Sequence, residues 1–281
     1  MSISQTWFIT GCSTGLGRAL AIYLLAHGHR VVATARKPAN IASLPGATAD
    51  NYLALPLDVT QPGQIEATVA QAWQRWGRVD VVVNNAGYGL VGSIEGMGDA
   101  QIRHQFEVNF FGAVAVTKAF LPLMRQAGGG RFLHVSSIAG LNAAPGGAMY
   151  SASKFALEGF SEGLHKEGAA VGITSTLIEP GPFRTDWAGR SLVYAEQRIE
   201  AYEATVGTMF AYLDGANGRQ KGDPDRAAAA MAAVAAMDQP PLRLLLGAGA
   251  HRTFFKKVAD LQAEAQQHEA LTLSADYPDA A

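Results

Sequence analysis

Short, uninterrupted apolar runs alternate with helix-like segments along most of the 281-residue chain. Runs of this kind, in contrast to runs in which every second residue is polar, are typical of parallel strands that helices cover on both faces. Strands and helices that alternate in this way form right-handed crossovers and a doubly wound sheet. We therefore predict an α/β fold with a doubly wound parallel sheet. The predicted strands are Thr6 to Thr10, Arg30 to Ala35, Tyr52 to Leu57, Val79 to Val83, Arg131 to Val135, Ile173 to Ile178 and Pro241 to Leu246.

The segments between these runs carry helix start and stop signals. The first helix ends at His27-Gly28, and the second begins at Pro62 and ends at Gly77. Proline favours the first helical turn, and glycine favours the position after the last one. Further helices are predicted at about Asp99 to Arg125, at about Ser151 to Gly168, from Asp223-Pro224 onward, and at Thr253 to Leu271 in the tail.

Composition excludes several classes of protein. With 22 basic and 24 acidic residues the net charge is −2, which argues against a broad basic surface for nucleic acid or anionic lipid. The apolar run Ala227 to Met237 is too short to span a bilayer, and the N-terminus lacks a secretory signal. One cysteine excludes a disulfide framework, and no histidines occur at metal-ligand spacing, so no metal is expected. We expect a cytoplasmic protein that binds a small molecule.

Residues 182–222 differ in character from the rest of the chain. They show no strand signal and are rich in aromatic residues, which are Phe183, Trp187, Tyr194, Tyr202, Phe210 and Tyr212. We predict a helical insertion over residues 182–222 that covers a substrate pocket as a lid within a single domain, 1–281. With Tyr88 and Leu141, these aromatics favour a hydrophobic substrate, such as a steroid-like or aryl ketone. The alternative is that they form an ordinary core for the lid helices.

A glycine-rich loop follows the first predicted strand and precedes the first helix. Its glycines permit a tight turn and let backbone N–H groups approach an anion, and the helix N-terminus adds positive potential. A pyrophosphate is the natural occupant at this place in a βαβ unit. The alternative is a turn that only packs the helix on the strand. The residues expected to line the anion site are Gly11, Ser13, Thr14, Gly15, Leu16 and Gly17.

The end of the second strand predicts which nucleotide binds. A site for NAD places an acidic residue there to bind the ribose 2′-hydroxyl. This chain instead has Ala35 followed by Arg36 and Lys37, whose cations would stabilise a 2′-phosphate. We therefore predict a preference for NADP(H) over NAD(H). The alternative is that Arg36 is a solvated loop charge.

Four motifs in order along the chain resemble those of the short-chain dehydrogenase/reductase family. They are TGxxxGxG at Thr10 to Gly17, Asn84-Asn85-Ala86-Gly87, Tyr150-xxx-Lys154, and Pro180-Gly181 followed by Thr185. The stretches VVATARKP and PGPFRTDW are similar to the branch that contains 17β-hydroxysteroid and retinol dehydrogenases. The resemblance implies a Rossmann-type fold and an NADP(H)-dependent oxidoreductase that interconverts an alcohol with a ketone or aldehyde.

The resemblance also implies roles for residues at the cofactor. Asp58, next to Val59, would bind the adenine amino group. Asn84 and the backbone of Ala86 and Gly87 would hold the adenine ribose. The structural alternatives are that Asp58 caps a strand end and that Asn84 hydrogen-bonds to the backbone of a neighbouring strand. The residues expected at the nicotinamide end are Pro180, Gly181 and Thr185.

Tyr150 and Lys154 are the candidate catalytic pair, since residues four apart share one helix face. A free tyrosine has a pKa of about 10 and is a poor base at neutral pH. A nearby ammonium, together with the positive charge of an oxidised nicotinamide, favours the phenolate and lowers that pKa. Tyr150 would then act as the acid/base. The family pattern adds Ser137 as a second contact to the substrate oxygen and Asn109 as a residue that breaks a helix and holds a water beside the lysine.

Two other functions remain as alternatives. A nucleotide-sugar epimerase or dehydratase shares the Tyr-xxx-Lys pair, but its glycine spacing is tighter and its chain is longer. A cofactor-sensing binding protein without turnover usually lacks the tyrosine or the lysine, both of which are present here. The resemblance also implies a homodimer or homotetramer assembled through the helices around Ile102 to Met124 and Ser151 to Gly168.

Overall fold

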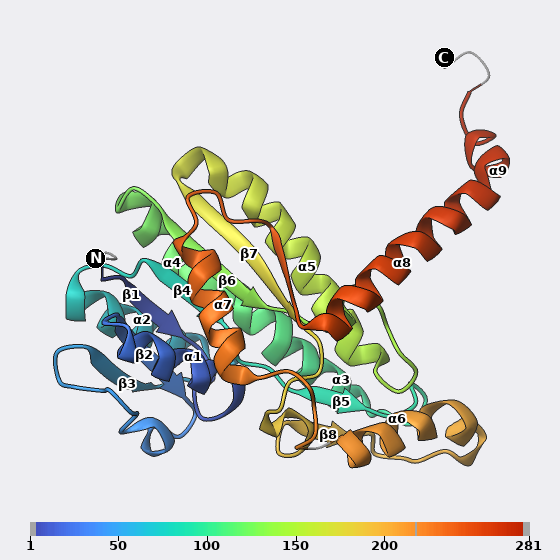
Figure 1. Ribbon diagram of the computed structural model, residues 1–281, viewed down its shortest axis with the longest axis horizontal. Coiled ribbons are helices and arrows are strands. Elements are labelled where there is room, and N and C mark those ends of the chain that lie inside the picture. Colours follow the sequence, from blue (N-terminus) through green and yellow to red (C-terminus); the bar gives the residue numbers. More distant parts are fainter. Residues whose placement is uncertain (1–3, 217, 278–281) are drawn as a thin grey trace.

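A seven-stranded sheet forms the centre of the computed structural model, which describes residues 4–216 and 218–277 (Figure 1). Neighbouring strands follow the order β3-β2-β1-β4-β6-β7-β9, and each of these pairings is parallel. The chain therefore builds outward from β1 in both directions, which opens a crevice at the carboxyl ends of β1 and β4. The strands are β1 Thr6–Ile9, β2 Arg30–Ala35, β3 Tyr52–Pro56, β4 Val81–Asn84, β6 Gly130–Val135, β7 Ile173–Pro180 and β9 Arg243–Leu246.

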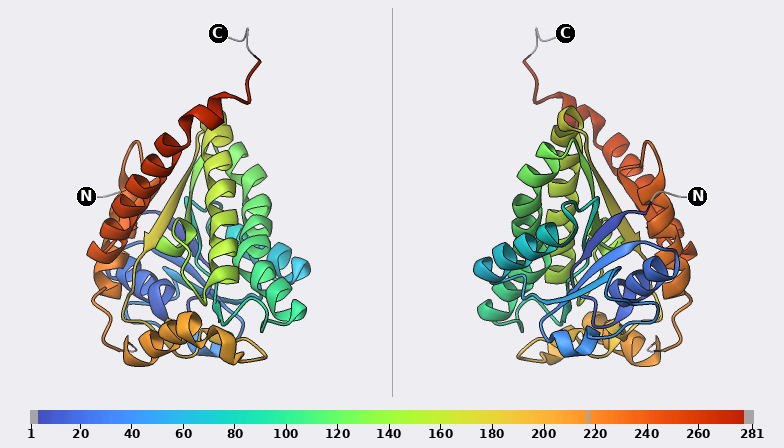
Figure 2. Two further views of the ribbon diagram at one scale, coloured as in Figure 1. Left: turned by 90° about the vertical axis from the view of Figure 1, so that its right-hand side faces the viewer. Right: turned by 90° about the vertical axis from the view of Figure 1, so that its left-hand side faces the viewer.

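Helices cover both faces of the sheet, as the two side views show (Figure 2). Successive side chains of a strand point to opposite faces, so Trp7 and Ile9 lie in one buried cluster and Phe8 lies in the other. The prediction of a doubly wound parallel sheet is confirmed. On one face lie α1 Gly15–Ala26 and α7 Pro224–Ala236, and on the other α2 Pro62–Trp76, α4 Gly112–Gln126 and α5 Ala148–Gly168.

The predicted helix from Asp99 to Arg125 is two helices joined by a π turn. Helix α3 spans Asp99–Phe106, the π turn spans Glu107–Phe111, and α4 follows without a break in the chain of helical residues. The apolar pattern continues through this turn, and only the family resemblance, which implies a helix break at Asn109, predicted it. Within the part of the chain that the structure describes, this stretch alone is long and apolar enough to cross a bilayer. Its α4 half is nevertheless a layer of the fold, with Phe120 and Met124 fully buried against the sheet.

The lid, residues 182–222, begins and ends at one place. The N–H of Gly222 donates to the carbonyl of Pro182 (3.1 Å), and the N–H of Arg184 donates to the carbonyl of Gly222 (2.9 Å). Helix α6, Glu203–Ala216, lies within it. The prediction that the lid has no strand was wrong, because β8, Leu192–Tyr194, pairs in parallel with β5, Gly89–Val91. Three-residue strands are too short to produce a periodic pattern, and this pair forms only through tertiary contact.

The C-terminal segment leaves the body of the molecule. Helix α8, Ala248–Gln267, projects away from it, and the short α9, Glu269–Leu273, follows (Figure 1). The predicted tail helix therefore exists but begins five residues earlier than expected. The other boundaries differ from the prediction by a few residues, and α5 begins at Ala148, which places Tyr150 in its first turn.

Candidate active site

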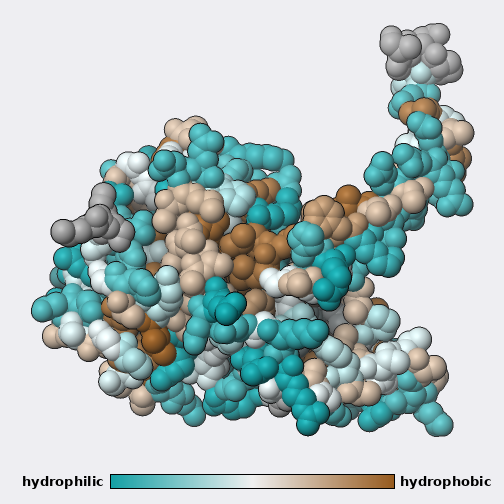
Figure 3. All heavy atoms as spheres, viewed as in Figure 1, coloured by the Kyte–Doolittle hydropathy of each residue, from teal (hydrophilic) through white to brown (hydrophobic). Residues whose placement is uncertain are grey.

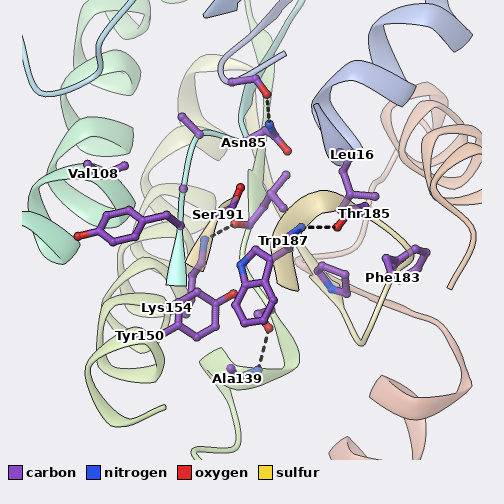
Figure 4. A pocket seen from close by; sticks show the side chains of 18 of the residues that line it. Leu16, Asn85, Val108, Ala139, Tyr150, Lys154, Phe183, Thr185, Trp187 and Ser191 are labelled. Carbon is purple, nitrogen blue, oxygen red and sulfur yellow. Dashed lines mark hydrogen bonds between the residues drawn. The ribbon is translucent and has the colours of Figure 1, made fainter. Parts of the chain in front are cut away.

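A cavity of about 650 Å³ lies at the carboxyl ends of the central strands, between the sheet and the lid. Its walls include Gly11 after β1, Ala35 at the end of β2, Asn85 after β4, Val135 at the end of β6 and Pro180 at the end of β7. Five strands thus deliver residues to one cavity, as expected at the switch point of a doubly wound sheet. The close view of this pocket shows the lid residues facing the sheet residues across it (Figure 4).

The glycine loop forms one end of the cavity. Gly11 and Gly15 have φ angles of 72° and 62°, which L side chains rarely adopt. A Cβ at Gly11 would lie 2.9 Å from the Cα of Ala86, so the two loops approach too closely for any other residue. The N-cap Thr14 makes no side-chain capping bond, which leaves the first-turn N–H groups of α1 available to an anion. The loop therefore fits the pyrophosphate of a dinucleotide.

Asn85 links this loop to β4. Its side-chain amide donates to the carbonyls of Thr10 (2.8 Å) and Gly11 (3.0 Å). The hydroxyl of Thr10 in turn accepts the backbone N–H groups of Asn85 and Ala86, each at 2.9 Å. The prediction that Asn84 holds the adenine ribose was wrong, because its side chain points away from the cavity. Its buried amide donates to Thr117 (2.9 Å) and lies 3.2 Å from Nδ1 of His134. Consecutive residues of an extended chain point in opposite directions, so Asn85 and not Asn84 faces the glycine loop.

The structure brings most of the predicted cofactor residues together. Gly17 and Lys37 do not line the cavity: a Cβ at Gly17 would clash with the Asn85 amide beneath the loop, and Lys37 is exposed beyond the end of β2. The predicted residues that do line it are Gly11, Ser13, Thr14, Gly15, Leu16, Arg36, Asp58, Val59, Ala86, Gly87, Tyr150, Lys154, Pro180, Gly181 and Thr185.

Ser137, Tyr150 and Lys154 meet at the floor of the cavity. Lys154 Nζ donates to the carbonyl of Val135 (2.8 Å) and lies 5.9 Å from the centre of the Tyr150 ring. Ser137 accepts the N–H of Ala139 (3.1 Å), which caps the turn Ile138–Gly140, and its hydroxyl lies close enough to Tyr150 to affect the pKa of the phenol. Side chains from α5 and from the turn after β6 are thus held around one point.

Burial dominates the electrostatics of this pair. It raises the pKa of Tyr150 to about 12, and the hydrogen bond with Ser137 only partly offsets it. Burial also lowers the pKa of Lys154 to about 8, although the carboxylate of Glu158 favours its ammonium form. The expectation that the nearby ammonium lowers the pKa of Tyr150 is not met in the chain alone, because desolvation outweighs it. The phenol is therefore protonated at neutral pH until further positive charge arrives.

Asn109 supports the pair from the π turn. Its amide donates to the carbonyl of Tyr88 (3.0 Å) and to Ser153 (3.2 Å), and its oxygen accepts the N–H of Tyr88 (3.0 Å). A Cβ at Gly87 would lie 3.2 Å from that oxygen and 3.6 Å from Lys154 Nζ, so the glycine lets both side chains approach the backbone. Asn109 is buried and does not line the cavity. The water it is expected to hold stays a prediction.

A buried acidic cluster lies behind Lys154, and no local sequence pattern predicts it. Glu158 on α5 and Glu179 on β7 face each other beside Arg243 of β9. Arg243 Nε is 3.1 Å from Glu158 and 3.4 Å from Glu179, but among the described residues neither oxygen of Glu179 has a hydrogen-bond partner. Burial, reinforced by the charge of Glu158, raises the pKa of Glu179 to about 8, and burial also raises that of Glu158. Burial therefore favours the protonated form of Glu179 at neutral pH.

Comparisons with known proteins identify the family. Residues 5–192 match the family model described as short chain dehydrogenase. The chain belongs to this family. An oxidoreductase named BOA17 from Botryotinia fuckeliana is 38% identical over 273 residues, which are 97% of this chain and 99% of that protein. A solved short-chain dehydrogenase from Streptomyces avermitilis is 37% identical, with a TM-score of 0.91 over 98% of this chain and 100% of the other.

The match confirms the predicted resemblance, including its branch. Human retinol dehydrogenase 8 is 42% identical over 194 residues, which are 67% of this chain and 62% of that protein. As a member of an oxidoreductase family that uses nicotinamide cofactors, the chain has a cavity that fits such a group at its glycine loop. Within residues 4–216 and 218–277, no group of three or more His, Cys, Asp and Glu side chains is placed to hold a metal ion.

Replacing Asn85 with alanine should weaken cofactor binding. The change leaves the carbonyls of Thr10 and Gly11 without the amide that orients them, which costs about 1–3 kcal/mol and lowers affinity roughly ten- to a hundredfold. Calorimetric titration with the dinucleotide measures this. Asn84→Ala is the matched control, expected to lower stability and leave affinity unchanged. Equal loss of affinity in both variants would contradict our placement of the two asparagines.

Glu179→Gln should change how stability depends on pH. Because the pKa of Glu179 in the fold lies above its ordinary 4.5, folding binds a proton between these values, and this contribution is lost as pH rises through about 8. The free energy of unfolding of the variant should therefore rise relative to that of wild type between pH 5 and pH 8, which urea denaturation would measure. Glu162→Gln is the control, since hydrogen bonds with Lys166 and Arg243 lower the pKa of Glu162 to about 2. A constant difference across this range for Glu179→Gln would refute the raised pKa of Glu179.

Proposed function

We propose that the protein is an NADP(H)-dependent oxidoreductase that interconverts an alcohol with a ketone or aldehyde on a hydrophobic substrate. The observation that carries the proposal is the cluster of Ser137, Tyr150 and Lys154 at the floor of a cavity whose other end is the glycine loop. A dinucleotide bound by the loop would lie along the strand ends and present its nicotinamide to this cluster.

The side chains divide the work of carbonyl reduction. Bound reduced nicotinamide supplies the hydride that the carbonyl carbon accepts. Ser137 and Tyr150 hold the carbonyl oxygen, and Tyr150, protonated at neutral pH, donates its proton to that oxygen as negative charge develops there. In the oxidative direction, the Lys154 ammonium and the positive charge of oxidised nicotinamide together stabilise the phenolate that accepts the alcohol proton. Lys154 also holds the nicotinamide ribose, and Asn109 positions the backbone of Tyr88 beside them.

The preference for NADP(H) rests on Arg36 at the rim of the cavity. Among the described residues its guanidinium has no hydrogen-bond or ion-pair partner, so it is available to a 2′-phosphate. Ala35, at the position where an NAD site carries an acid, offers no repulsion to that phosphate. Burial raises the pKa of Asp58, but its hydrogen bonds with Thr60 and the nearby charge of Arg36 outweigh burial and lower the pKa below its ordinary value. Its carboxylate is suited to the adenine amino group.

A hydrophobic substrate fits the lid side of the cavity. Trp187 packs against the Tyr150 ring, with 5.4 Å between ring centres, and so forms an apolar wall directly beside the reacting position. Other apolar residues of that wall are Val91, Val193, Met209 and Leu213. The similarity to retinol dehydrogenase 8, whose name indicates the apolar substrate retinol, supports the same kind of substrate here.

The alternative functions fit less well. A cofactor-sensing protein needs no acid/base cluster, yet the serine, tyrosine and lysine are all held in place around one point. An epimerase or dehydratase of nucleotide sugars needs room for a second nucleotide, whereas the lid closes this side of the cavity with Trp187. Steady oxidation of NADPH with a panel of carbonyl compounds, followed at 340 nm, distinguishes an enzyme from a sensor.

We further propose a cytoplasmic homodimer or homotetramer. Two phenylalanines are exposed on this side of the molecule: Phe155 on the outer face of α5, and Phe111 just before α4 begins. Side chains of this size are seldom left in water on adjacent helices, and pairing with a second copy would bury them. Sedimentation analysis at micromolar concentration would test this contact.

Tyr150→Phe should abolish turnover and leave cofactor binding intact. The variant keeps the ring that packs on Trp187 but lacks the proton, so kcat should fall by roughly 10²- to 10⁴-fold. Absorbance at 340 nm measures turnover, and quenching of tryptophan fluorescence measures NADPH binding. Tyr212→Phe, on the lid side of the same cavity, is the control that should retain activity. Turnover by Tyr150→Phe close to that of wild type would remove the proposed proton donor.

Arg36→Ala should shift the cofactor preference. Loss of a charge-assisted contact with the 2′-phosphate should raise KM for NADPH about ten- to a hundredfold and leave KM for NADH nearly unchanged. Lys37→Ala is the control, since Lys37 lies outside the cavity and should have a smaller effect. A wild-type enzyme that prefers NADH, or a ratio that Arg36→Ala does not alter, would be incompatible with the assignment.

A further inference from the structure

Helix α8 is anchored to the body only at its first turn. Ala250 is fully buried and packs beside Gly181, where a Cβ on that glycine would lie 3.1 Å from the Ala250 nitrogen. Beyond this turn the helix leaves the body (Figure 1), and large apolar side chains stand in solvent: Phe255 is 55% exposed, Val258 44% and Leu261 51%. The alignment with the Streptomyces structure covers 98% of the chain, so a 20-residue helix cannot fall outside it.

Apolar residues of α8 form a stripe, in which Phe254 is half-buried and the later members are exposed. Phe254, Val258, Leu261 and Ala265 are spaced by four, three and four residues, which places them on one side of the helix as in the seam of a left-handed coiled coil. Figure 3 shows apolar residues along one edge of this helix and hydrophilic residues beside them. Because the first turn is fixed by the body, the helix is already formed and a partner need not pay for its folding.

The charges of α8 run against its own dipole. Basic residues, which include Lys256 and Lys257, lie in its first half, and acidic residues, Asp260 and Glu264, lie in its second half. A helix that stands alone is stabilised by the opposite arrangement. Lys256 pairs with Asp260 (2.6 Å) on the side away from the stripe. Among the described residues, neither Lys257 nor Glu264, which flank the stripe seven residues apart, forms an ion pair.

We propose that α8 pairs with α8 of a second copy of this chain in the antiparallel direction. Phe254 then packs on Ala265 of the second copy, and Val258 packs on its Leu261. In an antiparallel pair, residues that flank the stripe on the same side of each helix face each other. Lys257 lies between Phe254 and Val258 on one helix, and Glu264 lies between Leu261 and Ala265 on the other. Each lysine therefore meets a glutamate, and this contact occurs twice per pair. Antiparallel packing also sets the two helix dipoles in opposition, which compensates the unfavourable charge order.

The second copy fits this surface better than a membrane does. An anionic lipid surface would attract the lysines of α8 but repel Glu264, which flanks the stripe. The same glutamate is what a second copy of this helix requires. The inference does not depend on the proposed reaction, and it concerns a surface distinct from α4 and α5.

Charge variants test the pairing and its direction. Lys257→Glu and Glu264→Lys each turn two attractive contacts into two repulsive ones, and should raise the dissociation constant of the α8 contact about tenfold or more. The double variant Lys257→Glu with Glu264→Lys exchanges the charges and should restore association. Sedimentation across a dilution series measures the association. In the single variants the mass should halve at a higher protein concentration than in wild type, whatever contact α4 and α5 make.

Lys256→Glu is the matched control, because it makes the same change of charge on the opposite side of the helix and should leave the mass unchanged. Circular dichroism checks that α8 remains helical in each variant. Masses that neither single variant alters would overturn the proposal and leave the stripe to a partner of other chemistry. A double variant that stays dissociated would overturn the antiparallel arrangement.

Discussion

The close approach of two loop backbones, after β1 and after β4, is the constraint on which the cavity depends. Gly11 and Ala86 come so near that no side chain fits at residue 11, and the hydroxyl of Thr10 and the amide of Asn85 tie the loops together with four hydrogen bonds. This clamp aims the N-terminus of α1 into the crevice. It also sets Gly87 against Asn109 and Lys154, so the anion end and the catalytic end of the cavity are positioned by one set of contacts.

Desolvation gives this arrangement its chemistry. Burial moves the pKa of Tyr150 up and that of Lys154 down, so the chain by itself favours the neutral form of each group. A cationic ligand beside them shifts this balance toward the phenolate, which couples the acid/base to the redox state of whatever nicotinamide is bound. Burial raises the pKa of both Glu158 and Glu179, which limits the negative charge behind the lysine.

The parts of the structure that could be predicted are those encoded by neighbouring residues. Apolar runs gave the sheet, and glycines that need positive φ gave the loop after β1. The pairing of β5 with β8 could not be predicted, because neither three-residue strand exists without the other. Pairing with β1 and β6 sets the residue at which β4 ends, and this decides which asparagine faces the crevice. The sequence alone therefore could not distinguish Asn85 from Asn84. The cluster of Glu158, Glu179 and Arg243 joins α5, β7 and β9, and no local pattern connects them.

The family match ends at residue 192, inside the lid, and the cavity divides at nearly the same place. Residues before it supply the glycine loop, the strand ends and the cluster around Tyr150, whereas later residues such as Met209, Tyr212 and Leu213 supply only the wall opposite. The lid closes on itself at Phe183, whose ring also approaches Gly247 just before α8, and α8 is anchored beside Gly181. The substrate wall and the projecting helix therefore share one base, the turn that follows β7. Contacts that steady α8, such as the proposed pairing with a second copy, would also steady this turn and the substrate wall that begins there.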